Sequence, residues 1–123
     1  MSAPKKIMIV DDEADLRDLI AYNLVKKGYE VVESNNGKEA VELIPIVRPD
    51  LIIMDLMMPE MNGIDACKFI RSIQLERQPI IIFFTARSEY FARQATEDAG
   101  ANDYLLKPLH PASLIAHLQK WAG

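Results

Sequence analysis

The sequence predicts an α/β fold in which five parallel strands form one sheet and helices cover both of its faces. Three observations lead to this prediction: five short apolar runs recur along the chain, an amphipathic segment follows each run, and the connections are short. Strands that alternate with helices form parallel sheets, because each helix carries the chain back in a right-handed crossover. Residues 1–123 are expected to form a single domain, with residues 1–5 as a flexible N-terminus.

The apolar runs are the expected strands, and the third run is the most informative. It lies between a Pro-Asp pair and the Met-Pro pair at residues 58–59, and it holds only long or branched apolar residues. Such a run is typical of a strand that is buried on both faces of a parallel sheet. The five expected strands are residues 7–10, 31–32, 51–54, 80–84 and 104–106.

Between the strands, apolar residues recur at helical spacing and mark five helix faces. The expected faces hold Leu16, Leu19, Ile20, Asn23 and Leu24; Ala40, Val41, Leu43 and Ile44; Ile64, Cys67 and Ile70; Ala92, Ala95, Thr96 and Ala99; and Leu114, Ile115, Leu118 and Trp121. Gly28 and Gly100 are expected to end the first and fourth helices, and Pro45 to close the second. Trp121 continues the apolar stripe of the last helix and is expected in the core.

The expected strand order brings several acids together. Of the orders common in doubly wound sheets, the flavodoxin-like order 2-1-3-4-5 fits five strands and places the first and third side by side. Asp11 and Asp12 follow the first strand and Asp55 follows the third, so three carboxylates are expected in one crevice. Like charges at close range disfavour joint ionisation, and a hard divalent cation relieves this repulsion. Alternatively, Asp11 or Asp12 caps the next helix, and capping and metal binding can coexist.

The other two strands at this edge also end in polar residues. The fourth run ends in Thr85, which offers a hydroxyl donor, and the fifth in Lys107, which offers an ammonium charge. Taken singly, Thr85 reads as a turn residue and Lys107 as a solvated one. Together with the acids they fit phosphoryl transfer to a carboxylate nucleophile, which needs positioning and charge neutralisation more than proton chemistry.

Composition excludes several classes of protein. The chain is 50% apolar, carries a net charge of −4 and has no block of Lys or Arg, which argues against direct nucleic-acid binding. No apolar run is long enough to span a membrane, and the first residues do not form a signal peptide. The single cysteine, Cys67, excludes a disulfide framework, is read as core filler, and fits a cytoplasmic location.

The ordered motifs of this chain resemble those of the receiver domain of the two-component response-regulator family (CheY-like). The resemblance covers residues 6–121. Its matching elements are Val10-Asp11-Asp12-Glu13, residues 54–59 with Gly63, Thr85-Ala86, and residues 99–108. It implies that Asp55 is the phosphoacceptor and takes its phosphoryl group from a histidine kinase or a histidine phosphotransfer protein.

The resemblance also implies roles for the neighbouring residues. Asp12 and Asp55 would bind Mg²⁺ (or Mn²⁺) with the backbone carbonyl of Met57, and Asp11 would help mainly through water. Lys107 would contact the phosphoryl group, and the bond between Lys107 and Pro108 is expected to be cis. Thr85 and Tyr104 would form a switch pair, in which the ring of Tyr104 follows the Thr85 hydroxyl inward.

Such a protein is a signalling switch and not an enzyme, although it catalyses its own phosphorylation and dephosphorylation. It would act on a downstream protein target, with a homodimer on phosphorylation as a further option. The expected output surface holds Arg87, Tyr90, Phe91, Arg93 and Tyr104, although Phe91 can also be read as a core residue. Met57 and Arg87 would tune the lifetime of the phosphoryl group, and the apolar Met57 predicts slow to moderate dephosphorylation.

Three rival classes fit the sequence less well. A flavin carrier would need a loop rich in Ser, Thr or Gly after the first strand, where this chain has acids. A phosphatase with an aspartate nucleophile would carry a second acid at position 57. A module used only for binding would be expected to lack one of the acids or Lys107. The chain could also be a receiver excised from a longer response regulator or a hybrid kinase.

Overall fold

The computed structural model describes residues 5–122, and the expected flexible N-terminus therefore lies, apart from Lys5, outside the described residues. Five strands alternate with five helices in this range, and the strand order is β2-β1-β3-β4-β5 with every pair parallel. The predicted fold and strand order are confirmed. The elements are β1 (Lys6–Val10), α1 (Ala14–Lys26), β2 (Glu30–Ser34), α2 (Gly37–Val47), β3 (Leu51–Met54), α3 (Gly63–Ser72), β4 (Ile80–Thr85), α4 (Glu89–Ala99), β5 (Asp103–Leu106) and α5 (Pro111–Ala122).

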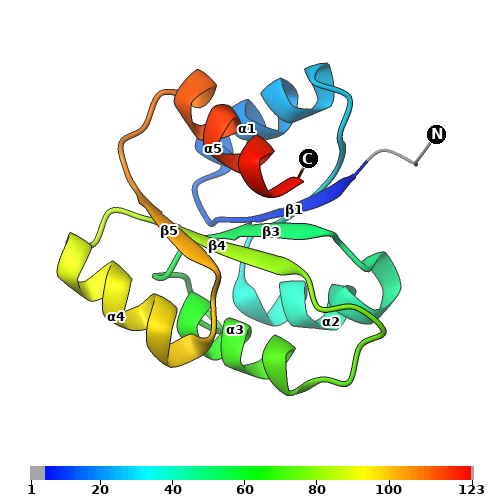
Figure 1. The fold of residues 1–123 in the computed structure, drawn as a ribbon, viewed down its shortest axis with the longest axis vertical. Coiled ribbons are helices and arrows are strands. Elements are labelled where there is room, and N and C mark those ends of the chain that lie inside the picture. The colour runs from blue at the N-terminus through cyan, green and yellow to red at the C-terminus, as the bar shows by residue number, and fades with distance from the viewer. Residues whose placement is uncertain (1–4, 123) are drawn as a thin grey trace.

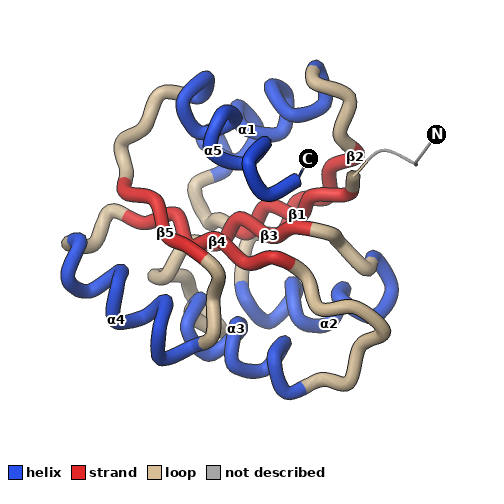
Figure 2. The backbone as a smooth tube through the Cα atoms, viewed as in Figure 1, coloured by secondary structure: helices blue, strands red, loops and turns tan. Residues whose placement is uncertain are grey.

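The helices form two layers around the sheet. Helices α1 and α5 cover one face, and α2, α3 and α4 cover the other (Figure 1). Figure 2 shows the sheet running between these layers, with β5 at one edge and β2 at the other. Each layer encloses its own group of fully buried side chains, among them Ile9 and Ile53 under α1 and α5, and Met54 and Phe83 under α3 and α4. The central strands are therefore buried on both faces, as their apolar sequences predict.

The register of the strands determines which residues meet at the carboxyl edge of the sheet. Val10 of β1 lies opposite Met54 of β3, and Met54 lies opposite Phe83 of β4. The residue that follows β1 is thus Asp11, and the residue that follows β3 is Asp55. The amide of Asp55 donates a hydrogen bond to the carbonyl of Val10 at 3.0 Å, which fixes the two acid-bearing segments against each other.

Side-chain caps begin three of the helices. Asn36, Asn62 and Ser88 accept hydrogen bonds from backbone amides three residues later, at 2.8, 2.9 and 3.2 Å, and so satisfy N–H groups that have no partner within the helix. Gly100 ends α4 in the left-handed conformation, as predicted.

Pro45 does not close the second helix, contrary to the prediction. Helix α2 continues through it to Val47 and ends at Arg48, whose φ of 53° is left-handed. A proline removes one N–H donor from a helix. Because Pro45 lies in the last turn, the missing hydrogen bond does not end the helix there. Ile44 is buried and Val47 is half-buried, and both pack this segment against the core.

Two expected core residues lie on the surface instead. Leu19 is 46% exposed, and Ala21 takes a place beside Ile20 in the buried face of α1. Trp121 is 41% exposed, and its indole N–H donates a hydrogen bond to Asp103 at 3.4 Å. An indole has one polar edge, so a polar partner at the surface satisfies it better than the core would.

Among residues 5–122, every helix is too short or too polar to span a membrane.

Candidate functional site

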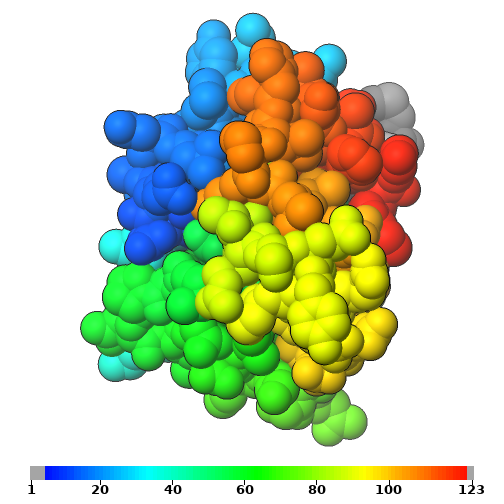
Figure 3. Space-filling view, turned by 90° about the vertical axis from the view of Figure 1, so that its left-hand side faces the viewer, coloured from blue at the N-terminus to red at the C-terminus, as the bar shows by residue number. Residues whose placement is uncertain are grey.

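The polar residues predicted at the strand ends gather at one edge of the sheet. Asp11, Asp55 and Thr85 are buried, with exposed fractions of 3, 7 and 0%, whereas Asp12 is exposed. They follow or end the adjacent strands β1, β3 and β4, and Lys107 directly follows β5. Figure 3 faces this edge, where the start of α1 in blue, the segment before α3 in green, the start of α4 in yellow and the segment after β5 in orange adjoin.

Asp11, Asp12 and Asp55 form a compact set of oxygen donors. Carboxylate oxygens of all three lie within 4.8 Å of one another. Hard divalent cations such as Mg²⁺ prefer oxygen ligands, and one or two carboxylates with further oxygens are their usual protein ligands. The donor set therefore fits Mg²⁺, and a Mg²⁺ ion would also relieve the repulsion between these carboxylates.

Lys107 neutralises part of this acidic cluster. Its ammonium Nζ donates hydrogen bonds to Asp11 Oδ2 at 2.9 Å, to Glu13 Oε1 at 2.9 Å and to Asp55 Oδ2 at 3.0 Å. The side chain of Lys107 is only 9% exposed, so little water screens these ion pairs. The peptide bond between Lys107 and Pro108 is cis.

Glu13 is a member of the site that the sequence analysis did not single out. It is part of the motif Val10-Asp11-Asp12-Glu13, in which the sequence analysis assigns a role only to the two aspartates. Its amide donates a hydrogen bond to Asp11 Oδ1 at 2.9 Å, and this turn carries its carboxylate towards Lys107. The signal in the sequence was the acid directly after Asp12, but a surface acid at a helix start has the same pattern.

The pKa values of Asp11 and Lys107 are both raised, for different reasons. Burial raises the pKa of the Asp11 carboxyl above its ordinary value, and its hydrogen bonds with the Glu13 amide and Lys107 only partly offset this. Burial opposes the charge on the Lys107 ammonium, but hydrogen bonds to Glu13, Asp11 and Asp55 outweigh it and raise the pKa of Lys107. Lys107 therefore stays charged at neutral pH, as a contact for an anionic group requires.

Asp55 is held on both of its oxygens. Oδ2 accepts from Lys107, and Oδ1 accepts from the amide of Met57 at 3.3 Å. Gly63 allows α3 to approach this segment, because a Cβ at position 63 would lie 2.2 Å from the carbonyl oxygen of Asp55. The Gly63 amide also donates to the Leu56 carbonyl at 2.9 Å. A larger residue than glycine would therefore clash with the Asp55 backbone at position 63.

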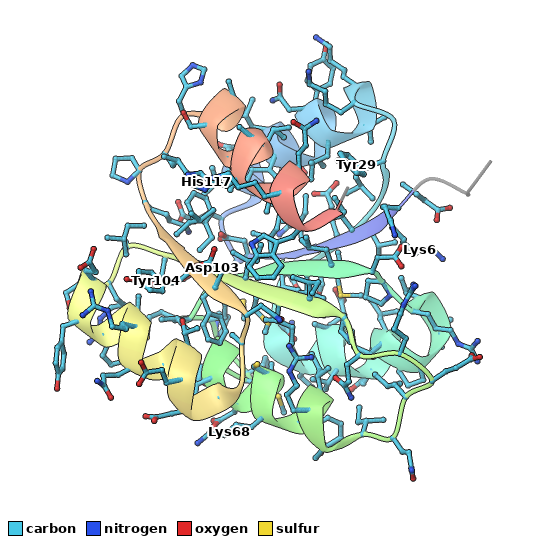
Figure 4. All side chains as sticks on the ribbon, in the orientation of Figure 1. Lys6, Tyr29, Lys68, Asp103, Tyr104 and His117 are labelled. Carbon is cyan, nitrogen blue, oxygen red and sulfur yellow. The ribbon has the colours of Figure 1, made fainter. Side chains whose placement is uncertain are left out.

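Thr85 and Tyr104 lie on the same face of the sheet. Thr85 is opposite Leu106, and Phe83 is opposite Tyr104, so the two residues are two register positions apart on neighbouring strands. The Thr85 hydroxyl accepts a hydrogen bond from the Arg87 amide at 3.1 Å. Tyr104 is half-buried on the side of β5 that faces α4 (Figure 4), and the nearby Tyr104 hydroxyl raises the pKa of Arg93.

Four of the five predicted output residues lie on or just before α4, and Tyr104 lies on β5; they differ in exposure. Tyr90 is 72% exposed, and Arg93 pairs with Glu89 at 2.7 Å on the helix surface. Phe91 is half-buried and packs against the core, in line with the alternative reading of this residue. The Arg87 guanidinium lies over the Phe91 ring, 3.9 Å from its centroid. The predicted surface therefore has one exposed aromatic anchor, Tyr90.

The chain is similar to known proteins of one family. A family model described as the response regulator receiver domain matches residues 7–119. The chemotaxis protein CheY of Thermotoga maritima is 40% identical over 117 residues, which cover 94% of this chain and 96% of that protein. The alkaline phosphatase synthesis transcriptional regulatory protein PhoP of Bacillus subtilis is 37% identical over 115 residues, 94% of this chain but 47% of PhoP. The chain thus spans about half the length of PhoP.

Solved structures share the same architecture. The crystal structure of the receiver domain of a sensor histidine kinase from Pseudomonas aeruginosa, with a magnesium ion coordinated in its active-site cleft, superimposes with a TM-score of 0.87 at 35% identity. The match covers 98% of this chain and 99% of that one.

Proposed function

Because this chain belongs to the response regulator receiver domain family, we propose that it is a signalling switch that accepts a phosphoryl group on Asp55. Receiver domains of response regulators are signalling switches, and the acidic cluster at the end of β3 fits a phosphorylation site. The observation that carries the proposal is the position of Asp55, which lies among Asp11, Asp12 and Lys107 at the carboxyl edge of the sheet.

Asp55 acts as the nucleophile in the proposed transfer. A carboxylate oxygen attacks the phosphorus of a phosphohistidine, the phosphorus–nitrogen bond breaks, and the histidine of the donor takes up a proton as it leaves. The donor would be a histidine kinase or a histidine phosphotransfer protein. Burial of Asp55 in a site that holds fixed donors favours this reaction, because the donors need not reorganise when charge builds up.

Asp12, Asp55 and the backbone carbonyl of Met57 would hold Mg²⁺ (or Mn²⁺) directly, with Asp11 acting mainly through water. The ion, when bound, would neutralise charge on the phosphoryl oxygens. Lys107 would neutralise the other side, because its ammonium already lies 3.0 Å from Asp55 Oδ2 and carries three donors. With an ion on the carboxylates, donors of Lys107 that now go to Asp11 and Asp55 become available to the phosphoryl group.

Thr85 and Tyr104 would transmit the phosphorylated state to the surface. The Thr85 hydroxyl donates to a phosphoryl oxygen, and the ring of Tyr104 follows into the space on the same face of the sheet. This movement changes the surface of α4, β5 and α5, where the exposed Tyr90 offers an aromatic anchor. We infer a downstream protein as the target, a cytoplasmic location, and a homodimer of the phosphorylated form as a second mode of output.

The decisive experiment is the intact mass of the protein after incubation with Mg²⁺ and a small acyl phosphate. We expect a gain of one phosphoryl group that requires Mg²⁺ and is lost in Asp55→Asn. A gain that persists in Asp55→Asn would place the modification elsewhere. No gain from the acyl phosphate or from a phosphorylated histidine phosphotransfer protein would contradict the proposal and favour a module that only binds.

A further inference from the structure

We propose that Met57 is a peroxide-sensitive modification site, and that its sulfoxide gives Arg87 a strong hydrogen-bond acceptor beside the phosphoacceptor. The modification would regulate the lifetime of the phosphoryl group, and this regulatory part rests on the proposed function. The oxidation itself and its effect on Arg87 do not depend on phosphorylation.

Met57 is the most exposed methionine of residues 5–122. Met57 is 52% exposed, whereas Met8 and Met54 are fully buried, each at 0%. Met58 and Met61 are half-buried and pack against the core. Oxidation of methionine by peroxides follows access to the sulfur, so Met57 should react before the other methionines of residues 5–122.

Arg87 is already in place to use a better acceptor at position 57. Its Nη1 lies 3.5 Å from Met57 Sδ, and the Phe91 ring supports its other side. Among the salt bridges of the described residues, none involves Arg87. A guanidinium carries five N–H donors, and a thioether sulfur is a weak acceptor. One donor of the exposed Arg87 guanidinium is therefore directed at a weak acceptor, and a stronger acceptor at the same place would bind it better.

The chemistry requires only hydrogen peroxide as the oxidant. One peroxide oxygen is transferred to the Met57 sulfur: a sulfur–oxygen bond forms, the oxygen–oxygen bond breaks, and water leaves. The sulfur loses two electrons and the peroxide gains them. The product is a polar sulfoxide whose oxygen can accept from Arg87, and methionine sulfoxide reductases restore the thioether.

The modified side chain would stand next to the reacting carboxylate. The Met57 amide donates to Asp55 Oδ1 at 3.3 Å, so the residue flanks the phosphoacceptor. The thioether is an apolar cover that cannot orient water. A sulfoxide oxygen held by Arg87 can accept a hydrogen bond from water near the phosphorus, and hydrolysis of phosphorylated Asp55 should become faster.

The first test maps oxidation during a titration with hydrogen peroxide, using fragment-ion mass spectra to separate the methionines. We expect Met57 to gain one oxygen atom before Met58, Met61, Met8 and Met54. Met57→Leu should lose this fast phase, and the matched control Met58→Leu should keep it. Oxidation of Met58 or Met61 at the same rate as Met57 would overturn the proposal.

The second test follows the guanidinium N–H signals of Arg87 by NMR in the unphosphorylated protein. Oxidation should shift them in the wild type and in Met58→Leu, and leave them in place in Met57→Leu. Arg87 signals that do not move on oxidation of Met57 would overturn the coupling between the two residues.

The third test measures the decay of the phosphoryl group before and after oxidation within each variant, so that only the ratio of the two rates is compared. The decay should become several-fold faster in the wild type and in Met58→Leu, and stay unchanged in Met57→Leu. Equal ratios in all three proteins would overturn the regulatory part. A protein that accepts no phosphoryl group before oxidation would contradict the proposed function instead, and the first two tests would still decide the modification site.

Discussion

Lys107 Nζ lies 3.0 Å from Asp55 Oδ2, although 52 residues separate the two in the chain and β4 runs between their strands. The lysine side chain reaches past the end of β4 to meet the carboxylate. Both side chains are only 9% exposed, so their attraction is weakly screened. The same ammonium serves Asp11 and Glu13, and it is the one cation among the salt bridges of the described residues that contacts this cluster.

Replacing Lys107 by Ala should therefore destabilise the protein in the absence of Mg²⁺. Removing one partner of a buried ion pair leaves uncompensated charge, and we expect a loss of about 3 kcal/mol in the free energy of unfolding. Urea denaturation measures this loss. Mg²⁺ should restore part of it, because a bound cation would neutralise the same carboxylates.

The matched control is Lys68→Ala, which removes an exposed lysine from α3. We expect its effect to stay within about 0.5 kcal/mol, as for most surface substitutions. Equal losses in the two variants would show that Lys107 does not neutralise the cluster in solution.

Asp11→Asn should make the Mg²⁺-free protein more stable at neutral pH. Burial raises the pKa of Asp11, so the folded protein binds this proton more tightly than the unfolded chain does. By linkage, stability falls as the pH rises from the ordinary Asp value, near 3.8, through the raised folded value, and the full penalty is present above it. The asparagine keeps an acceptor for the Glu13 amide and removes the charge.

The stability gain from Asp11→Asn should shrink as the pH falls below the ordinary Asp pKa. Urea denaturation of both proteins at pH 7 and at about pH 3.5, which is just below the ordinary Asp pKa, measures this change. The difference between the proteins isolates Asp11 from the other carboxyls that titrate. A difference that is the same at both pH values would contradict the raised pKa.

Gly63→Ala should destabilise the protein, because the added Cβ would meet the Asp55 carbonyl oxygen at 2.2 Å and the Leu56 Cα at 3.0 Å. Both contacts are with backbone, so α3 or the segment after β3 must move. We expect a loss of about 2 kcal/mol. Thermal and urea denaturation would measure it.

Gly28→Ala provides the comparison for Gly63→Ala. A Cβ added at position 28 would meet no atom, but the φ of Gly28 is +96°. Only backbone strain therefore acts in Gly28→Ala, and we expect it to lower the free energy of unfolding by about 1 kcal/mol. Gly63→Ala should also weaken Mg²⁺ binding, because Asp55 would shift, and Gly28→Ala should not. A Gly63→Ala protein that binds Mg²⁺ and unfolds like the wild type would contradict the packing argument.

Much of the fold could be predicted because the strands are buried on both faces. Continuous apolar runs such as residues 51–54 leave few other interpretations, and strand ends then identify Asp55 and Lys107. The rotation of α1 could not be predicted in the same way. Leu19 and Ile20 are both apolar and adjacent, and only contacts with the sheet and α5 decide which of them is buried.

Glu13 and Trp121 illustrate what the sequence leaves open. Glu13 joins the site through a hydrogen bond of its own amide to Asp11, which a list of strand ends cannot reveal. Trp121 fits the apolar stripe of α5, but the acceptor on Asp103 lies at the surface. Both residues are placed by polar contacts with other segments, which the hydrophobic pattern does not contain.

Met57→Asn should shorten the lifetime of the phosphoryl group, if Asp55 carries it as proposed. An amide two residues after the phosphoacceptor can orient water, which the exposed thioether cannot. We expect decay several-fold faster than in the wild type, measured by loss of the phosphorylated mass after the donor is removed. Met58→Asn is the neighbouring control, since Met58 packs against the core. An unchanged decay rate would contradict a role for position 57.

Tyr90→Ala should weaken capture of the downstream partner and leave phosphorylation unchanged. Tyr90 is 72% exposed at the start of α4, so truncation removes little packing and should change stability by no more than about 0.5 kcal/mol. Exposed aromatic anchors often carry much of the energy of an interface, and loss of one commonly costs about 2 kcal/mol of binding. Pull-down by the phosphorylated protein, followed by titration with the captured partner, measures this loss.

Tyr22→Ala is the matched control for Tyr90→Ala, because Tyr22 is 63% exposed on α1, in the other helical layer. If α4 forms the output surface, Tyr22→Ala should retain the partner that Tyr90→Ala loses. Equal capture by both variants would show that the partner binds away from Tyr90. Loss of phosphorylation together with capture in Tyr90→Ala would instead point to a folding defect, which circular dichroism would detect.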